Sequence, residues 1–211
     1  MATDPFSAFG AGPLFIETIR VDDRCILRPE PHLRRMRETV REVFGTKIKL
    51  PEAEELLPAE CPPGLVKCRL LYDRAIRKIE CLPYEPRRIA SLRLVAAPEG
   101  FDYRLKRADR RELEALRSQR DDCDEVLIVR DGAITDTSYS NVVFFDGRRY
   151  VTPDTCLLAG VRRHELLRSG RIVEERITPR DLERFERVWL INAMLGLDDG
   201  LSLPVGAICR G

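Results

Sequence analysis

Lysine is scarce in this chain. Of 36 basic residues only five are lysine, at positions 47, 49, 67, 78 and 106, and the others are arginine. Arginine replaces lysine where only positive charge is needed, but a guanidinium stays protonated and is not a nucleophile. Lys106 is the only lysine in the second half of the chain and is therefore a candidate for amine chemistry. Taken alone, it fits a solvated surface cation better.

Histidine and paired cysteines are also sparse. The chain has two histidines, His32 and His164, and seven cysteines with no Cys-x-x-Cys pair. Metal ligands in proteins usually recur at such short spacings. We therefore expect reduced, structural thiols and no metal site.

Strong net charge and long apolar runs are absent as well. The net charge of +1 gives no general attraction to nucleic acid or to an anionic membrane. No apolar run approaches the length of a membrane span, and the first residues lack the pattern of a signal peptide. With 44% hydrophobic and 34% charged residues over 211 positions, we expect a globular cytoplasmic protein without nucleic-acid or membrane partners.

The first part of the chain is predicted to form an α+β lobe, residues 1–97. Two β-prone runs flank Asp22-Asp23 and indicate a hairpin. Apolar residues at helical spacing follow, and Gly45 is a plausible helix end. Further strands are expected at 65–72, 75–81 and 89–96.

The second part, residues 98–211, is predicted to form a larger lobe. Helical patterns cover 108–120 and 160–169, and Asp131-Gly132 and Asp146-Gly147 are typical of hairpin turns. Strands are expected at 125–129, 133–135, 141–145, 149–152 and 188–192, with a further strand and helix within 171–186.

Five stretches of the chain carry a family resemblance. In order they are 15–20 (FIETIR), 32–36 (HLRRM), 105–110 (LKRADR), 134–144 (ITDTSYSNVVF) and 152–163 (Thr152-Pro153, then LAGVRR). Together, from about Phe15 to Leu203, they resemble the class IV aminotransferase family. This family comprises pyridoxal-phosphate enzymes of fold type IV and includes branched-chain and D-amino-acid aminotransferases and aminodeoxychorismate lyase. The resemblance implies an α+β chain with a small N-terminal α/β lobe and a larger, barrel-like C-terminal α/β lobe that binds the cofactor.

The resemblance assigns Lys106 and Arg35 to the cofactor, pyridoxal 5'-phosphate. Lys106 matches the lysine that binds it as a Schiff base and moves the substrate proton. Arg35 matches the arginine of the His-x-x-Arg motif, whose forked donors suit a phosphate. Without the motif, Arg35 resembles a residue of a solvated helix face.

Asp136 stands where the family usually has a glutamate beside the pyridine nitrogen. A carboxylate there keeps the ring protonated and electron-withdrawing. Aspartate is one methylene shorter, so the ring would lie closer or a water would intervene. The following Ser138, Ser140 and Asn141 would order the loop beside the ring, and Tyr139 between them is counted among the cofactor-binding residues.

Two further segments are implied to bind the phosphate. Gly160-Val161-Arg162 opens a helix, and Asn192-Ala193-Met194 follows a strand. The family usually has threonine in place of Arg162, so this arginine would either strengthen phosphate binding or point into solvent. The segment 192–194 is closer to the lyase branch than to the aminotransferases.

The reaction stays open at this level. We expect a 4-amino-4-deoxychorismate lyase-like enzyme that releases 4-aminobenzoate and pyruvate. The alternatives are an amino-acid aminotransferase, for branched-chain or D-amino acids, a cofactor-binding homologue without turnover, and an arginine-rich binding module. A small amino compound is the expected substrate and a homodimer the expected assembly.

Overall fold

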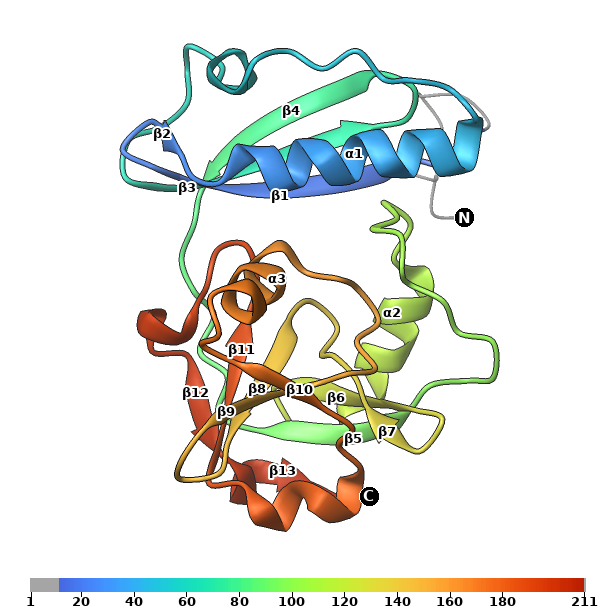
Figure 1. Ribbon diagram of the computed structural model, residues 1–211, viewed down its shortest axis with the longest axis vertical. Helices are drawn as coiled ribbons and strands as arrows, with labels where there is room; N and C mark the ends of the chain where they lie inside the picture. Colours follow the sequence, from blue (N-terminus) through green and yellow to red (C-terminus); the bar gives the residue numbers. More distant parts are fainter. Residues whose placement is uncertain (1–11, 211) are drawn as a thin grey trace. The chain divides into compact units, whose positions relative to one another are not determined.

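The computed structural model describes residues 12–210, which form two compact units (Figure 1). Of these residues, unit 1 comprises 12–85 together with Leu105–Asp109. Unit 2 comprises Pro86–Arg104 and 110–210. The expected boundary at 97/98 differs from this division because strand β5 (Leu92–Ala96) pairs with β6 (Glu125–Arg130) in unit 2.

Unit 1 contains a four-stranded antiparallel sheet in the order β2-β1-β3-β4. The predicted hairpin is β1 (Phe15–Asp22) and β2 (Cys25–Ile26), joined through Asp23 and Arg24, which both have positive φ. The predicted strands at 65–72 and 75–81 are β3 (Leu65–Tyr72) and β4 (Ile76–Pro83). A short 3-10 turn, η2 (Ala53–Leu56), precedes β3.

Helix α1 (Pro29–Phe44) packs on this sheet (Figure 1). Leu33, Met36 and Val40 recur at helical spacing and are buried in one core with Phe15 and Ile19 of β1. The helix ends at Gly45, whose φ of 64° is the left-handed conformation that glycine adopts at little cost.

The segment 105–109 belongs to unit 1 because it pairs with the start of β1. The Ile16 amide donates to the Lys106 carbonyl at 2.9 Å, and the Ala108 amide donates to the Leu14 carbonyl at 2.8 Å. Phe15 and Arg107 form the isolated bridge of this pairing. Lys106 is thereby fixed beside the strand that carries Glu17.

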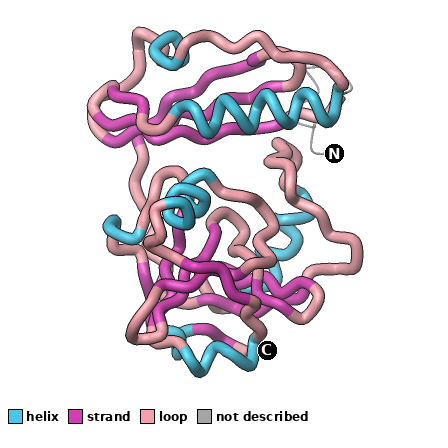
Figure 2. The backbone as a smooth tube through the Cα atoms, in the orientation of Figure 1, coloured by secondary structure: helices cyan, strands magenta, loops and turns pink. Residues whose placement is uncertain are grey.

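Unit 2 contains two sheets that share one core. A five-stranded sheet has the order β10-β9-β8-β11-β12, and a four-stranded sheet has the order β13-β5-β6-β7. Figure 2 shows the strands in magenta. Leu92 and Leu127 of the second sheet are buried with Val142, Phe144 and Leu190 of the first. The remaining strands are β7 (Ala133–Ile134), β8 (Asn141–Phe145), β9 (Tyr150–Pro153), β10 (Val173–Glu175), β11 (Arg187–Ile191), β12 (Ser202–Pro204) and β13 (Ile208–Cys209).

Two short helices belong to this unit, α2 (Arg111–Arg117) and α3 (Val161–Arg168). The expected helix at 108–120 is thus an α-helix over its middle, followed by the 3-10 turn η3 (Ser118–Arg120). The helix expected within 171–186 is the 3-10 turn η4 (Pro179–Arg184). The chain also forms η5 (Leu197–Asp199) and η6 (Val205–Ala207).

Among residues 12–210, no helix combines the length and the apolar character that crossing a bilayer requires. The same residues contain no group of three or more His, Cys, Asp or Glu side chains that could hold a metal ion.

Candidate functional site

The polar centre of unit 1 is a buried carboxylate, Glu17. Arg35 donates to it twice, from Nε to Oε1 and from Nη2 to Oε2, both at 2.7 Å. Nδ1 of His32 lies 2.7 Å from Oε2. The side chain of Glu17 is 0% exposed and that of Arg35 is 17% exposed, so this is a largely desolvated, charge-assisted pair.

The charges within this group determine its protonation. Burial alone would raise the pKa of Glu17, but the charge and hydrogen bonds of Arg35 and the bond from His32 lower it to about 2. Burial lowers the pKa of His32, and the positive charges of Arg35 and Lys106 lower it further against the opposing effect of Glu17. His32 is therefore neutral at pH 7, and because ionised Glu17 can only accept, Nδ1 carries the hydrogen.

Lys106 lies near this group. Its backbone is held by the pairing with β1, its side chain is partly exposed, and its charge reaches His32. Unit 1 therefore brings together two of the predicted site residues, Arg35 and Lys106, around Glu17 and His32.

The polar centre of unit 2 is another buried carboxylate, Asp136. Its Oδ1 accepts from Nδ2 of Asn141 at 2.9 Å, and its Oδ2 accepts from the amides of Leu157 and Leu158, both at 3.0 Å. An isolated bridge between Asp136 and Asn141 closes the loop that follows β7. All three donors are neutral.

Burial consequently dominates the titration of Asp136. It raises the pKa of Asp136 to about 6, although the Leu158 amide, Asn141 and the more distant Arg163 act in the opposite direction. Within residues 12–210, Asp136 makes no direct ion pair. A cationic group of a ligand next to this carboxylate would stabilise its ionised form.

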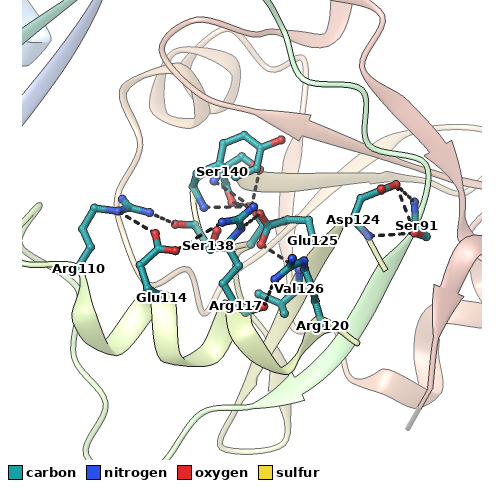
Figure 3. A network of polar contacts seen from close by, with 12 residues as sticks. Ser91, Arg110, Glu114, Arg117, Arg120, Asp124, Glu125, Val126, Ser138 and Ser140 are labelled. Atoms are coloured by element: carbon teal, nitrogen blue, oxygen red, sulfur yellow. Dashed lines mark hydrogen bonds and ion pairs between the residues drawn. The ribbon is translucent and has the colours of Figure 1, made fainter. Parts of the chain in front are cut away.

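The loop 137–140 is ordered by its own side chains. The Thr137 hydroxyl accepts from the amides of Tyr139 and Ser140, at 3.3 and 3.0 Å, and lies 2.8 Å from the Ser140 hydroxyl. Arg110, at the start of α2, donates from Nη2 to the Ser138 carbonyl at 2.8 Å (Figure 3). The predicted residues Ser138, Tyr139 and Ser140 thus form a fixed turn beside Asp136.

Gly160 meets this loop through Asn141. A Cβ at Gly160 would lie 1.9 Å from Oδ1 of Asn141, so the close approach requires glycine. Asn141 also donates to the Leu158 carbonyl at 2.8 Å. Gly160 is the N-cap of α3 and supplies no capping side chain, which leaves the first helical amides, beginning at Val161, available to an anion.

Arg162 is directed away from bulk solvent. Its side chain is 13% exposed and donates from Nη1 to Glu165 at 2.8 Å. The guanidinium lies against Gly196, where an added Cβ would be 2.2 Å from Nη2. This conformation does not match the expectation that Arg162 points into solvent. In the structure Arg162 forms an ion pair with Glu165 within α3.

The segment 192–194 forms a tight turn after β11. Oδ1 of Asn192 accepts from the amides of Met194 and Leu195, at 2.8 and 3.1 Å. The Met194 amide is therefore occupied by a side chain of its own turn. Asn192 and Ala193 are half-buried.

The match to known proteins covers most of the chain. The model of the class IV amino-transferases matches residues 14–198. The chain belongs to this family. The predicted family and the predicted α+β fold are thus confirmed, and with them a pyridoxal-phosphate-dependent type of enzyme.

Three relatives illustrate the range of the family. An uncharacterized protein of Haemophilus influenzae is 34% identical over 188 residues, which is 88% of this chain and 99% of that protein. A crystal structure from Haemophilus somnus 129pt, provisionally named a 4-amino-4-deoxychorismate lyase, is 29% identical with a TM-score of 0.78, covering 89% of this chain and 100% of that one. A structure from Mesorhizobium loti, provisionally named an amino-acid aminotransferase, is 26% identical with a TM-score of 0.76, covering 95% and 100%.

The structure adds two residues of this class IV protein that the motifs did not identify. Glu17 and His32 lie inside recognised motifs, yet neither was assigned a role. A signal was present for Glu17: strand alternation places it on one face with Phe15, Ile19 and Val21, where it is the only charged residue. A charged residue on an otherwise apolar face needs a partner, and Arg35 supplies it.

Proposed function

We propose that this chain binds pyridoxal 5'-phosphate and uses it to act on a small amino compound. The observation that carries the proposal is the family match over residues 14–198. Lys106 stands in the stretch that resembles the segment of the family's cofactor lysine. Of the residues proposed for the cofactor, Lys106 and Arg35 belong to unit 1, and Asp136 with its loop belongs to unit 2.

The buried Asp136 suits the pyridine nitrogen of this cofactor. The carboxylate is surrounded by neutral donors, and among residues 12–210 Oδ1 accepts only the bond from Asn141. A second lone pair on Oδ1 can therefore accept a proton-bearing nitrogen. Burial disfavours the ionised carboxylate and raises the pKa of Asp136 to about 6. The positive charge of the ring nitrogen would offset this effect of burial.

Two groups suit the phosphate. The amides at the start of α3 lack a side-chain cap, so they can donate to phosphate oxygens. The Nε and Nη2 atoms of Arg35 donate to Glu17. These two bonds fix the direction of the guanidinium, and with it the direction of Nη1, which we propose faces the phosphate. In the proposal Glu17 and His32 are positioning residues that hold Arg35 in a single conformation.

The proposed chemistry divides between these residues. Pyridoxal phosphate supplies an electron sink for the pair of electrons left at a substrate carbon. With the cofactor bound, the amine of Lys106 would anchor it and would accept the proton from the substrate α-carbon. Asp136 would keep the ring nitrogen protonated.

We favour lyase chemistry on 4-amino-4-deoxychorismate, with amino transfer as the second candidate. The support for the lyase is the Haemophilus somnus relative, whose chain is covered completely at 29% identity. The Mesorhizobium loti relative supports the alternative almost as well, at 26% identity. A PLP-binding protein without turnover is the third outcome that an assay must distinguish.

One pair of assays separates these outcomes. The purified protein, loaded with pyridoxal phosphate, is incubated with aminodeoxychorismate and, separately, with L- and D-amino acids plus 2-oxoglutarate. Formation of 4-aminobenzoate and pyruvate supports the lyase, and amino transfer alone supports the aminotransferase. The Lys106→Ala variant should form neither product, and a bound cofactor with no product in either assay would contradict both reactions.

The proposal also includes the assembly and location of the protein. A two-fold homodimer is the commonest assembly of soluble enzymes. The balanced net charge of +1 is compatible with a cytoplasmic enzyme whose partners are a small amino substrate and a second copy of the chain, without nucleic acid or membrane.

A further inference from the structure

Arg110 stands at a position where the start of a helix does not favour arginine. It is the residue before α2 and forms no side-chain bond to the first amides of that helix. Small polar side chains are preferred there because they can accept from these amides, and the positive end of the helix dipole disfavours a cation. The acidic residues of the first turn, Glu112 and Glu114, follow the usual preference. An arginine that breaks a local rule is a candidate for a role outside its own helix.

The guanidinium of Arg110 reaches three different segments of unit 2. Nη2 donates to the Ser138 carbonyl at 2.8 Å, and Nη1 lies 3.5 Å from the Tyr103 hydroxyl. Nε lies 3.7 Å from Oε1 of Glu114 in α2 (Figure 3). The side chain of Arg110 is 25% exposed. Because each nitrogen of the guanidinium faces a defined partner, the side chain has a fixed direction.

The bond to Ser138 is the shortest of these contacts. It joins a cation to a carbonyl oxygen, and charge-assisted hydrogen bonds of this length are stronger than neutral ones. The ion pair with Glu114 is longer, and the Glu114 side chain is 52% exposed, so water screens it. Arg110 is therefore bound more strongly to the loop that contains Ser138 than to its own helix.

The loop that Arg110 contacts is otherwise closed by its own residues. The Thr137 amide donates to the Ser140 carbonyl at 2.9 Å, and the Thr137 hydroxyl accepts from the amides of Tyr139 and Ser140. Ser138 lies between these residues and takes part in none of these bonds. The bond from Arg110 therefore holds the part of the loop that the internal bonds do not reach.

We propose that Arg110 is a positioning residue of the cofactor site: its bond to the Ser138 carbonyl holds the turn after Asp136 in the conformation that binds the cofactor. The inference rests on the proposed function, in which Asp136 and its loop bind pyridoxal phosphate. Arg110 acts through Ser138 and does not itself bind the cofactor. Without the bond, the turn samples several conformations, and the apparent affinity falls with the fraction of molecules in the binding conformation.

The first test examines the loop without the cofactor. Hydrogen–deuterium exchange of the cofactor-free protein should be faster at the amides of Tyr139 and Ser140 in Arg110→Ala than in the wild type. These two amides donate within the loop and so report its conformation. The matched control is Glu114→Gln, which removes the ion pair with Arg110 and leaves the bond to Ser138 in place. In this loop the control should exchange like the wild type.

The second test measures cofactor affinity. Titration with pyridoxal phosphate, followed by the visible absorbance of the bound form, should give a Kd on the order of 10-fold higher in Arg110→Ala, as for one lost hydrogen bond to a charged group. Low-millimolar guanidinium chloride should restore part of this affinity, and sodium chloride at the same concentration should not. A role limited to the stability of α2 would lower the Tm in Arg110→Ala and in Glu114→Gln without a response to guanidinium.

Three results would overturn the inference. They are a wild-type Kd in Arg110→Ala, whatever its loop exchange, an equal loss of affinity in Glu114→Gln, and an affinity that guanidinium does not restore at all. A wild-type protein that does not bind pyridoxal phosphate would instead contradict the proposed function. In that case the exchange of Tyr139 and Ser140 would still decide whether Arg110 fixes the loop.

Discussion

Arg35 and Glu17 are joined by two parallel hydrogen bonds of 2.7 Å, one to each carboxylate oxygen. The two bonds hold the Nε and Nη2 edge of the guanidinium against Glu17, and they thereby fix the direction of Nη1. The arginine that the family motif assigns to the phosphate is thus not a mobile surface cation, because a buried carboxylate on the neighbouring strand holds it in place.

Replacement of Glu17 by glutamine should destabilise unit 1. The variant keeps the side-chain volume but removes the buried negative charge that faces Arg35, and breaking a buried ion pair in this way typically costs about 3–5 kcal/mol. Chemical denaturation should show this loss. The matched control is Glu30→Gln, which removes an exposed pair with Arg37 and should cost at most about 1 kcal/mol. Equal losses in the two variants would contradict the role of burial.

The same pair predicts acid sensitivity. The pKa of Glu17 falls from 4.5 to about 2 on folding, so the stability from its ionised form is present above pH 4.5 and is lost as the pH falls toward 2. Unfolding free energies measured between pH 5 and pH 2 should fall less steeply in Glu17→Gln than in the wild type. Parallel curves would refute this assignment.

Asp136→Asn should retain the cofactor and lose turnover, on the order of 100-fold, because the neutral amide cannot hold the ring nitrogen in its protonated form. Steady-state rates with saturating cofactor provide the measurement. Asp154→Asn alters an exposed carboxylate in the segment after β9 and should leave the rate unchanged. An Asp136→Asn enzyme of wild-type rate would exclude Asp136 from the chemistry.

Gly160→Ala tests the contact between α3 and the Asp136 loop. The new methyl group would overlap Oδ1 of Asn141, so we expect a loss of about 1–3 kcal/mol in stability together with weaker cofactor binding. Gly206→Ala is the control, because a Cβ there meets nothing within 4 Å. If both variants bind cofactor equally well, cofactor binding does not depend on the close approach of Gly160 to Asn141.

Assembly is predicted separately. A homodimer should give about twice the 24.2 kDa chain mass by light scattering at micromolar concentration. A mass equal to the single chain under those conditions would contradict the proposed dimer without bearing on the cofactor.

Local patterns were enough to predict most elements of this fold. The hairpin at Asp22-Asp23 and the helix that ends at Gly45 depend on short-range turn and helix signals, and both form as expected. The division into units was not predictable in the same way. It depends on the pairing of β5 with β6 and on the return of residues 105–109 to β1, and long-range pairings of this kind leave no local signal.

The candidate site was likewise predictable only in part. The motif frame singled out Arg35, Lys106 and Asp136, but it could not show what holds them. The partner of Arg35 lies on another element, and two of the three donors to Asp136 are backbone amides, of residues 157 and 158, which almost any sequence would supply. Arg162 was ambiguous because an ion pair with Glu165 can form on an exposed or on a covered helix face, and no local pattern shows that Gly196 lies against the guanidinium.

The central claim is that Lys106 carries the cofactor, and one measurement tests it most directly. The protein is purified with pyridoxal phosphate, reduced with borohydride and digested, and the modified peptide is sequenced by mass spectrometry. We expect visible absorbance that disappears on reduction and a stable adduct on the peptide that contains Lys106. An adduct on Lys67 or Lys78 instead, or no adduct at all, would contradict the account.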